Sequence, residues 1–159
     1  MGTVDEASSA LGLARGLTRH ARVASICEEL QRALYSVGAE LGTNPEAGKS
    51  FATTTAADVA RLEQLMAELE AAVAMPAGFI LPGATAASGA IDLARAITRR
   101  AERRCVTLQK AGGLANPEVR RRLNRMSLLL FVLGRYEESL ARRTAKAAAG
   151  GAKSPRPRR

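Results

Sequence analysis

Apolar residues recur every three or four positions over long stretches of this chain, which is the spacing of one face of an α-helix. The segment from 21 to 42 is the clearest case, and its apolar positions are Val23, Ile26, Leu30, Leu34, Val37 and Leu41. Runs of β-branched or aromatic residues are missing, and aromatic residues make up only 3% of the chain. We therefore expect helices nearly throughout, and 47% apolar residues in a chain of 159 are enough for one helical core.

Capping signals predict where two of the helices begin. Thr3 and Glu6 fit a capping box in which Thr3 is the N-cap of a helix from residue 4 to about residue 18. Thr55 and Asp58 fit the same pattern ahead of a later apolar stripe. Both pairs can satisfy backbone amides that the first turn of a helix leaves without partners.

Proline, glycine and asparagine mark the remaining helices. An apolar turn at 79–82 leads into a fourth helix, which Gly112 closes. Asn116 followed by Pro117 opens a fifth, because asparagine is a favoured N-cap and proline a favoured first helical residue. Short connections between five helices predict an all-α, five-helix antiparallel bundle over residues 1–149.

The chain carries no signal for secretion or for a membrane span. Its longest strongly apolar run, 126–133, is far too short to cross a bilayer, so we expect a cytoplasmic protein without membrane contact. Cys27 and Cys105 fall within helical patterns and are expected to be ordinary buried thiols. His20 is the single histidine, so no zinc-binding set can be assembled and no metal ligand from the protein is identified.

The formal charge of +9 is concentrated at the C-terminus. The last fourteen residues contribute five of these charges, from Lys146, Lys153, Arg156, Arg158 and Arg159. Residues 150–159 contain glycine and proline and nothing large to bury, so we expect a disordered basic tail there. This tail lacks aromatic residues that could stack on bases, which makes nucleic-acid binding an unfavoured interpretation.

An arginine-rich helix follows the apolar turn. Helical spacing projects Arg95, Arg99, Glu102 and Arg103 to one side, while the opposite stripe from Ile91 to Leu108 is apolar or small and can pack. Clustered guanidinium groups repel one another unless an anion lies among them, and phosphate matches their forked donors. The sequence therefore suggests a polyphosphate site, and the alternative is a solvated basic face in which Glu102 pairs with an arginine.

Four segments taken together resemble a known family. They are GTVDEASSALGLAR, LYSVGAELGT, FILPGATAASGAIDLARAITRRAERR and LNRMSLLLFVLGRY, and their order and spacing are those of the PduO-type ATP:cob(I)alamin adenosyltransferases. The similarity extends from Gly2 to about Tyr136. It implies a homotrimer with active sites at subunit interfaces. The implied reaction transfers the 5′-deoxyadenosyl group of ATP to cob(I)alamin and yields adenosylcobalamin and triphosphate.

The resemblance also implies which residues bind ATP. By position these are Arg99, Arg100, Glu102 and Arg103, with Asn124 from the next helix. Arg99 is the implied catalytic arginine, since cationic donors around a polyanionic leaving group stabilise the charge that collects there. A magnesium ion that accompanies ATP normally shares this work.

Three more residues are implied at the corrinoid side of the site. Phe79 would press against the lower face of the corrin, exclude the axial ligand and so take part in catalysis; the alternative is an ordinary apolar staple of the turn. Asp5 and Arg95 would pair across a subunit boundary, or would form a purely structural ion bridge. Further partners considered for such a protein are a reductase and an adenosylcobalamin-dependent acceptor enzyme.

This chain departs from the family pattern at several points. Family members usually begin earlier, with a T-G-D-x-G-x-T segment that wraps the ATP phosphates. The turn reads LPGA instead of LPGG, Asp92 stands where a histidine is usual, and Leu128 stands where an acid is usual. An additional carboxylate at Asp92 can pair with Arg95 or Arg99 and weaken phosphate binding. We therefore expect low or absent activity from this exact chain, and the alternative function is an N-terminally truncated, non-catalytic corrinoid-binding or assembly subunit.

Overall fold

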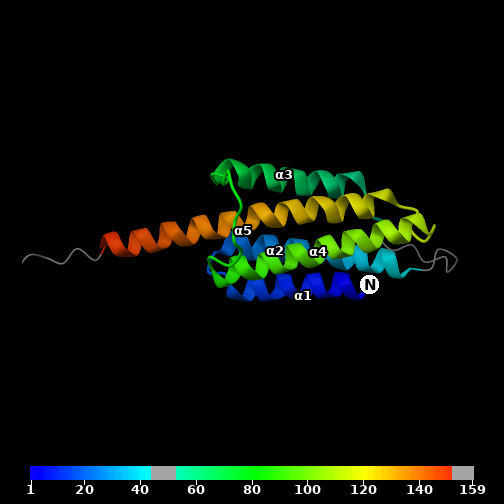
Figure 1. The fold of residues 1–159 in the computed structure, drawn as a ribbon, viewed down its shortest axis with the longest axis horizontal. Helices are drawn as coiled ribbons and strands as arrows, with labels where there is room; N and C mark the ends of the chain where they lie inside the picture. The colour runs from blue at the N-terminus through cyan, green and yellow to red at the C-terminus, as the bar shows by residue number, and fades with distance from the viewer. Residues whose placement is uncertain (44–52, 152–159) are drawn as a thin grey trace, which may run out of the picture.

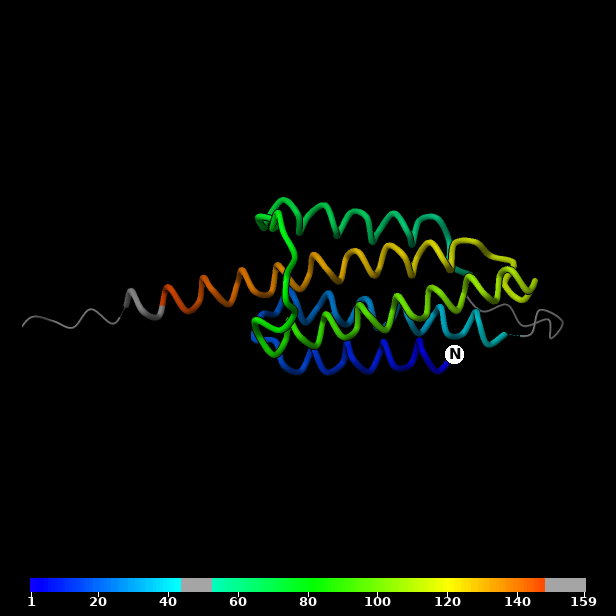
Figure 2. The backbone as a smooth tube through the Cα atoms, viewed as in Figure 1, coloured from blue at the N-terminus to red at the C-terminus, as the bar shows by residue number. Residues whose placement is uncertain are grey.

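Five helices form the regular structure of this chain in the computed structural model, which describes residues 1–43 and 53–151 (Figure 1). They are α1 (Gly2–Leu17), α2 (Ala21–Gly42), α3 (Ala56–Ala72), α4 (Ala86–Lys110) and α5 (Pro117–Gly151). Successive helices run in opposite directions along one axis (Figure 2). The predicted all-α, five-helix antiparallel bundle is confirmed for the described residues.

The helix starts follow the sequence signals in two of three cases. Thr55 caps α3 in a full capping box with Asp58, and the side chain of Asn116 accepts a hydrogen bond from the amide of Glu118 at the start of α5. The predicted capping box of Thr3 is wrong. Helix α1 begins at Gly2, because the amide of Val4 already donates to the carbonyl of Met1, at 2.7 Å.

Helix α4 lies between α1 and α5 and packs on both of them (Figure 1). Its buried stripe is made largely of small residues, which allow close helix packing: Ala87, Ala90, Ala94, Thr98 and Ala101. Larger side chains come from α5, where Leu123, Met126, Leu129, Leu130 and Leu133 are almost fully buried. This packing fixes one side of α4 in the core and leaves its charged positions at the surface.

Helix α3 packs along α5 on the other side of the bundle, and residues 73–85 carry the chain from it across α5 to the start of α4 (Figure 2). Ion pairs also tie α3 to α2: Arg22 to Glu68 at 2.6 Å, and Arg61 to Glu29 at 2.8 Å. The crossing segment contains Phe79 and ends in a turn at Gly83 with a positive φ of 97°. The turn that precedes α4 is thus anchored at both ends by packed helices.

The C-terminal part of α5 extends beyond the ends of the other helices (Figure 1). The helix continues to Gly151, slightly past residue 149, where the sequence predicts the end of the bundle domain. The predicted disorder of the basic tail falls mainly on residues 152–159, which lie outside the described residues. Within the part of the chain that the structure describes, no helix combines the length and the apolar character that a membrane crossing requires.

Candidate functional site

Helix α4 holds one row of arginines against α1. The guanidinium of Arg100 forms an ion pair with the carboxylate of Glu6, and that of Arg104 donates a hydrogen bond to the hydroxyl of Thr3. Thr3 is buried, so its hydroxyl needs a partner from the protein. These two arginines therefore act as structural ties between α4 and the first turns of α1.

A second row on α4 faces away from α1 and is not paired. Arg99 and Arg103 are exposed, lie one helical turn apart, and form no ion pair with any residue in the described ranges 1–43 and 53–151. Beside them, Glu102 Oε1 accepts a hydrogen bond from Asn124 Nδ2 on α5 at 2.9 Å. The structure thus brings together four of the five predicted ATP-binding residues and leaves two cations among them without a counter-charge.

Arg100 is the predicted ATP-binding residue that lies elsewhere. Arg100 is the next residue after Arg99, so its side chain points in another direction, and it pairs with Glu6. Helical spacing separates it from the stripe of Arg95, Arg99, Glu102 and Arg103, because neighbouring residues of a helix point about 100° apart. Phosphate contact by Arg100 would require the pair with Glu6 to open.

The carboxylate of Asp92 forms an ion pair with Arg95 of the same helix. Its Oδ1 lies 2.5 Å from Arg95 Nε, and its Oδ2 lies 3.6 Å from a guanidinium nitrogen of Arg135 on α5. Arg135 is buried, pairs with Glu138 at 3.0 Å, and stacks over the ring of Phe131. The expected pairing of Asp92 with a neighbouring arginine is confirmed, and the partner is Arg95, not Arg99.

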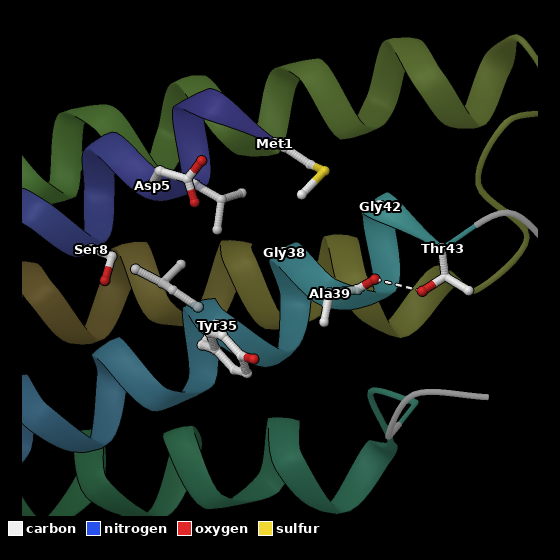
Figure 3. Close-up of a pocket in the computed structure, with 10 residues that line it drawn as sticks. Met1, Asp5, Ser8, Tyr35, Gly38, Ala39, Gly42 and Thr43 are labelled. Carbon is white, nitrogen blue, oxygen red and sulfur yellow. Dashed lines mark hydrogen bonds between the residues drawn. The ribbon is translucent and has the colours of Figure 1, made fainter. Parts of the chain in front are cut away.

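Asp5 does not meet Arg95 within one chain. It lies on α1 at the edge of a groove of about 370 Å³ between α1 and α2 (Figure 3). The groove has an apolar floor that includes Val4 and Leu34, and the phenol of Tyr35 stands at its rim with 79% of the residue exposed. The predicted Asp5–Arg95 pair therefore stays a prediction about contact between two chains.

Phe79 is the most exposed large apolar residue of the described chain, at 94%. It lies in the segment between α3 and α4, close to Leu81, which is 78% exposed. The turn after them packs tightly on α4, since a Cβ at Gly89 would lie 3.3 Å from Gly83 Cα. An ordinary staple would bury Phe79, so the structure does not support that alternative.

The predicted catalytic residue Arg99 is well separated from this turn. It lies about 20 Å along α4 from the start of the helix, by the usual rise per residue.

The described residues offer no cluster of three or more His, Cys, Asp or Glu side chains that could hold a metal ion. Both cysteines are buried and free. Burial raises the pKa of the Cys27 thiol to about 12, with Glu137 adding to the effect, so this thiol stays protonated at neutral pH.

The sequence interpretation missed the ties from α4 to α1, although a signal for them exists. Arg100 and Arg104 are four residues apart on α4, and Thr3 and Glu6 are three apart on α1, so the two pairs match across an antiparallel contact. Once the start of α1 is moved to Gly2, Thr3 and Glu6 are free to serve this role.

Leu128, which stands where an acid is usual in the family pattern, is partly exposed on α5.

Comparisons with known proteins agree with this arrangement. The family model described as cobalamin adenosyltransferase matches residues 1–137. The corrinoid adenosyltransferase of Citrobacter freundii is 34% identical over 139 residues, which cover 87% of this chain and 78% of that protein. Human corrinoid adenosyltransferase MMAB is 37% identical over 143 residues, which cover 86% of this chain but only 56% of the human protein.

Solved structures of the same kind have a closely similar fold. A phenylalanine-to-histidine variant of the PduO-type ATP:corrinoid adenosyltransferase from Lactobacillus reuteri, complexed with cobalamin and ATP, has a TM-score of 0.80 at 32% identity, with 89% of this chain and 77% of that chain covered. An arginine-to-lysine variant from the same organism, complexed with ATP, has a TM-score of 0.77 at 32% identity and covers 80% of that chain and 89% of this one. The chain therefore belongs to the cobalamin adenosyltransferase family, whose members are corrinoid adenosyltransferases.

Proposed function

We propose that this chain transfers the 5′-deoxyadenosyl group of ATP to the cobalt of a reduced corrinoid and releases triphosphate. The observation that carries the proposal is the pair of exposed guanidinium groups of Arg99 and Arg103, which form no ion pair among the described residues and lie beside the Glu102–Asn124 hydrogen bond. Two cations at one-turn spacing without a counter-ion are a ready binding site for a polyanion.

Arg99 and Arg103 have a direct role in this reaction. As the reduced cobalt attacks the 5′ carbon, negative charge collects on the departing triphosphate, and fixed guanidinium donors stabilise that charge more than they stabilise bound ATP. Asn124 and Glu102 hold each other at 2.9 Å, which leaves the second oxygen of the Glu102 carboxylate available for a ribose hydroxyl or for an arginine. Arg99 is the residue that we assign to the developing charge.

Phe79 and the segment around it would bind the corrinoid. An aromatic ring that is 94% exposed and is followed by exposed Leu81 is unusual unless a flat apolar ligand or another chain covers it. The phenylalanine and the arginine that are substituted in the two Lactobacillus reuteri variants are separated by the same number of positions as Phe79 and Arg99. This spacing supports the assignment of Phe79 to the corrinoid and of Arg99 to the nucleotide.

A homotrimer with sites between subunits is the assembly that we propose. Within one chain Arg99 and Arg103 are exposed, and Arg95 pairs with Asp92 and not with Asp5. A second chain that brings its Asp5 to Arg95 would have to compete with Asp92 for that guanidinium. Mg²⁺ would enter with ATP, because the described residues offer no metal cluster of their own. A reductase and an adenosylcobalamin-dependent acceptor enzyme would be transient partners of such an assembly.

A non-catalytic corrinoid-binding or assembly subunit is the competing function. Such a subunit has no need for unpaired arginines, whereas Arg99 and Arg103 have no acidic partner in the part of the chain that the structure describes, and Arg100 and Arg104 both contact α1. Similar structures complexed with both cobalamin and ATP also favour the catalytic function.

The decisive test is an anaerobic assay of the full chain with ATP, Mg²⁺ and reduced cobalamin. We expect turnover by the wild type, and a loss of at least about 100-fold in Arg99→Ala at an unchanged melting temperature, because an exposed arginine contributes little to stability. Arg142→Ala, which removes an equal charge from the protruding part of α5, should leave turnover unchanged. No turnover by folded wild-type protein would support the non-catalytic alternative.

A further inference from the structure

A small basic cavity lies next to the proposed ATP site. It has a volume of about 220 Å³ and is lined by Arg120, Arg121, Asn124 and Arg125 on the N-terminal part of α5. Asn124 is shared with the proposed ATP site through its hydrogen bond to Glu102. The cavity therefore continues the surface on which Arg99 and Arg103 stand.

The charges of this cavity are only partly balanced. Arg121 pairs with Glu118 at 2.9 Å, and Arg125 pairs with Glu63 at 2.6 Å. Arg120 is exposed and forms no ion pair within the part of the chain that the structure describes. Together with Arg99 and Arg103, this leaves three cations without acidic partners on adjoining turns of two helices.

The position of these arginines in α5 is unfavourable for the helix itself. Arg120 and Arg121 follow directly on the first turn, where backbone amides point outward and the helix dipole favours negative charge. Basic residues there run against the preference of a helix start for acidic ones, and packing does not explain them, since Arg120 and Arg121 are both exposed. An anion bound in the cavity would supply the negative charge that this part of the helix favours.

Helix geometry places the cavity in line with the unpaired row on α4. Because Glu102 meets Asn124 and the two helices are antiparallel, Arg99 lies to one side of that contact and Arg120 to the other. The separation of Arg99 and Arg120 along the helix axis is about 10 Å, from the usual rise per residue. A linear chain of several phosphates fits such a row of donors better than a single phosphate does.

The geometry points to a subsite for the distal phosphates of a linear triphosphate in the cavity formed by Arg120, Arg121, Asn124 and Arg125. Such a chain comes either from ATP or from the inorganic triphosphate that the reaction releases. The inference deepens the proposed function and rests on it for the identity of the nucleotide. The site itself can be tested without turnover, because inorganic triphosphate is a sufficient probe.

Calorimetric titration of the full chain with inorganic triphosphate, ATP and inorganic phosphate tests the subsite. We expect Arg120→Gln to weaken triphosphate and ATP binding about tenfold, the loss of one charge-assisted contact, and to leave the weak binding of single phosphate unchanged. Arg120→Lys should recover part of the affinity as a point charge. Arg142→Gln is the matched control on the same helix, and it should have no effect.

The outcomes separate the subsite from the proposed function. If Arg120→Gln and Arg121→Gln bind triphosphate as tightly as the wild type does, or if the wild type does not bind it, the subsite is wrong. Loss of turnover in Arg99→Ala would still stand in that case and would keep the proposed function. If triphosphate affinity falls in Arg120→Gln but the wild type shows no adenosyl transfer, the subsite stands and the function is wrong.

Discussion

Each of the two rows on α4 consists of two arginines, and the rows lie within one turn of each other, yet their contacts differ. Arg100 and Arg104 are held by Glu6 and Thr3 of α1, whereas Arg99 and Arg103 have no acidic partner among the described residues. If these arginines served only to keep the protein soluble, one paired row and one unpaired row would not be required. The difference shows that the first row ties α4 to α1, and it is the basis of our proposal that the second row binds a ligand.

The largest effect should come from removing the free row. We expect the double variant Arg99→Gln with Arg103→Gln to lose ATP binding by at least about 100-fold, because two charge-assisted contacts disappear together. Its melting temperature should stay within about two degrees, since both side chains are exposed and form no ion pair with a described residue. Calorimetry and thermal unfolding measure the two quantities; a clear fall in melting temperature would place this row among the structural ties.

The comparison extends to an arginine that is buried in an ion pair. Arg122 on α5 is buried and pairs with Asp58 at 3.0 Å, and Asp58 also completes the capping box of α3 with Thr55. We expect Asp58→Ala to lower the free energy of unfolding by about 2 to 3 kcal/mol, through the lost cap and the uncompensated buried charge. Denaturant unfolding measures this loss, and ATP affinity should not change in the folded variant.

The same carboxylate should make stability depend on pH. Burial alone would raise the pKa of Asp58, but hydrogen bonds from Thr55 and the charge of Arg122 outweigh it and lower the pKa below the ordinary 3.8. A carboxyl group whose pKa is lower in the folded state stabilises the protein at pH values above its ordinary pKa. This stabilisation is lost as the pH falls through the folded-state pKa. The stability difference between wild type and Asp58→Asn should therefore shrink below about pH 4. A difference that is constant down to pH 2 would contradict this assignment.

The paired row should show a smaller and purely structural effect. Arg104→Ala removes the donor that satisfies the buried hydroxyl of Thr3, so we expect a loss of about 1 kcal/mol in the free energy of unfolding. Thr3→Val in the same background should recover part of this loss, because no buried hydroxyl is then left without a partner. Additive effects of the two substitutions would show that the pair does not interact.

The smallest effect is expected for Glu6→Gln. Its ion pair with Arg100 is about half exposed, and such surface pairs contribute about 0.5 kcal/mol or less. Urea unfolding at low and high salt should show that this small contribution fades as salt rises. An increase in ATP affinity in this variant would indicate that Arg100 joins the phosphate site when Glu6 releases it.

Much of the fold could be predicted from the sequence because the signals are local. The periodicity of α2, the capping box at Thr55 and the Asn116–Pro117 start of α5 each depend on residues within one or two turns. The error at Thr3 has a different cause. A threonine three residues before a glutamate fits a cap equally well whether or not the helix has already begun; here the helix has begun at Gly2, and Thr3 and Glu6 instead contact Arg104 and Arg100 of α4.

The candidate site was predictable only in part for the same reason. Helical spacing predicts that Arg99, Glu102 and Arg103 share a face, and the hydrogen bond from Asn124 to Glu102 agrees with the resemblance to the family. Spacing places Arg100 on a different face of the helix from Arg99, but it does not reveal that Arg100 finds an acidic partner on α1. Contacts between two chains, including the predicted pairing of Asp5 with Arg95, depend on surfaces that one chain alone does not fix.

The central claim is tested most directly by comparing two adjacent residues. Arg103→Gln and Arg104→Gln remove the same charge from neighbouring positions of α4, one in the free row and one in the paired row. Calorimetric titration with ATP should show affinity at least about tenfold weaker in Arg103→Gln and within about twofold of wild type in Arg104→Gln. Equal losses in both variants, or a greater loss in Arg104→Gln, would contradict the assignment of the free row to the triphosphate.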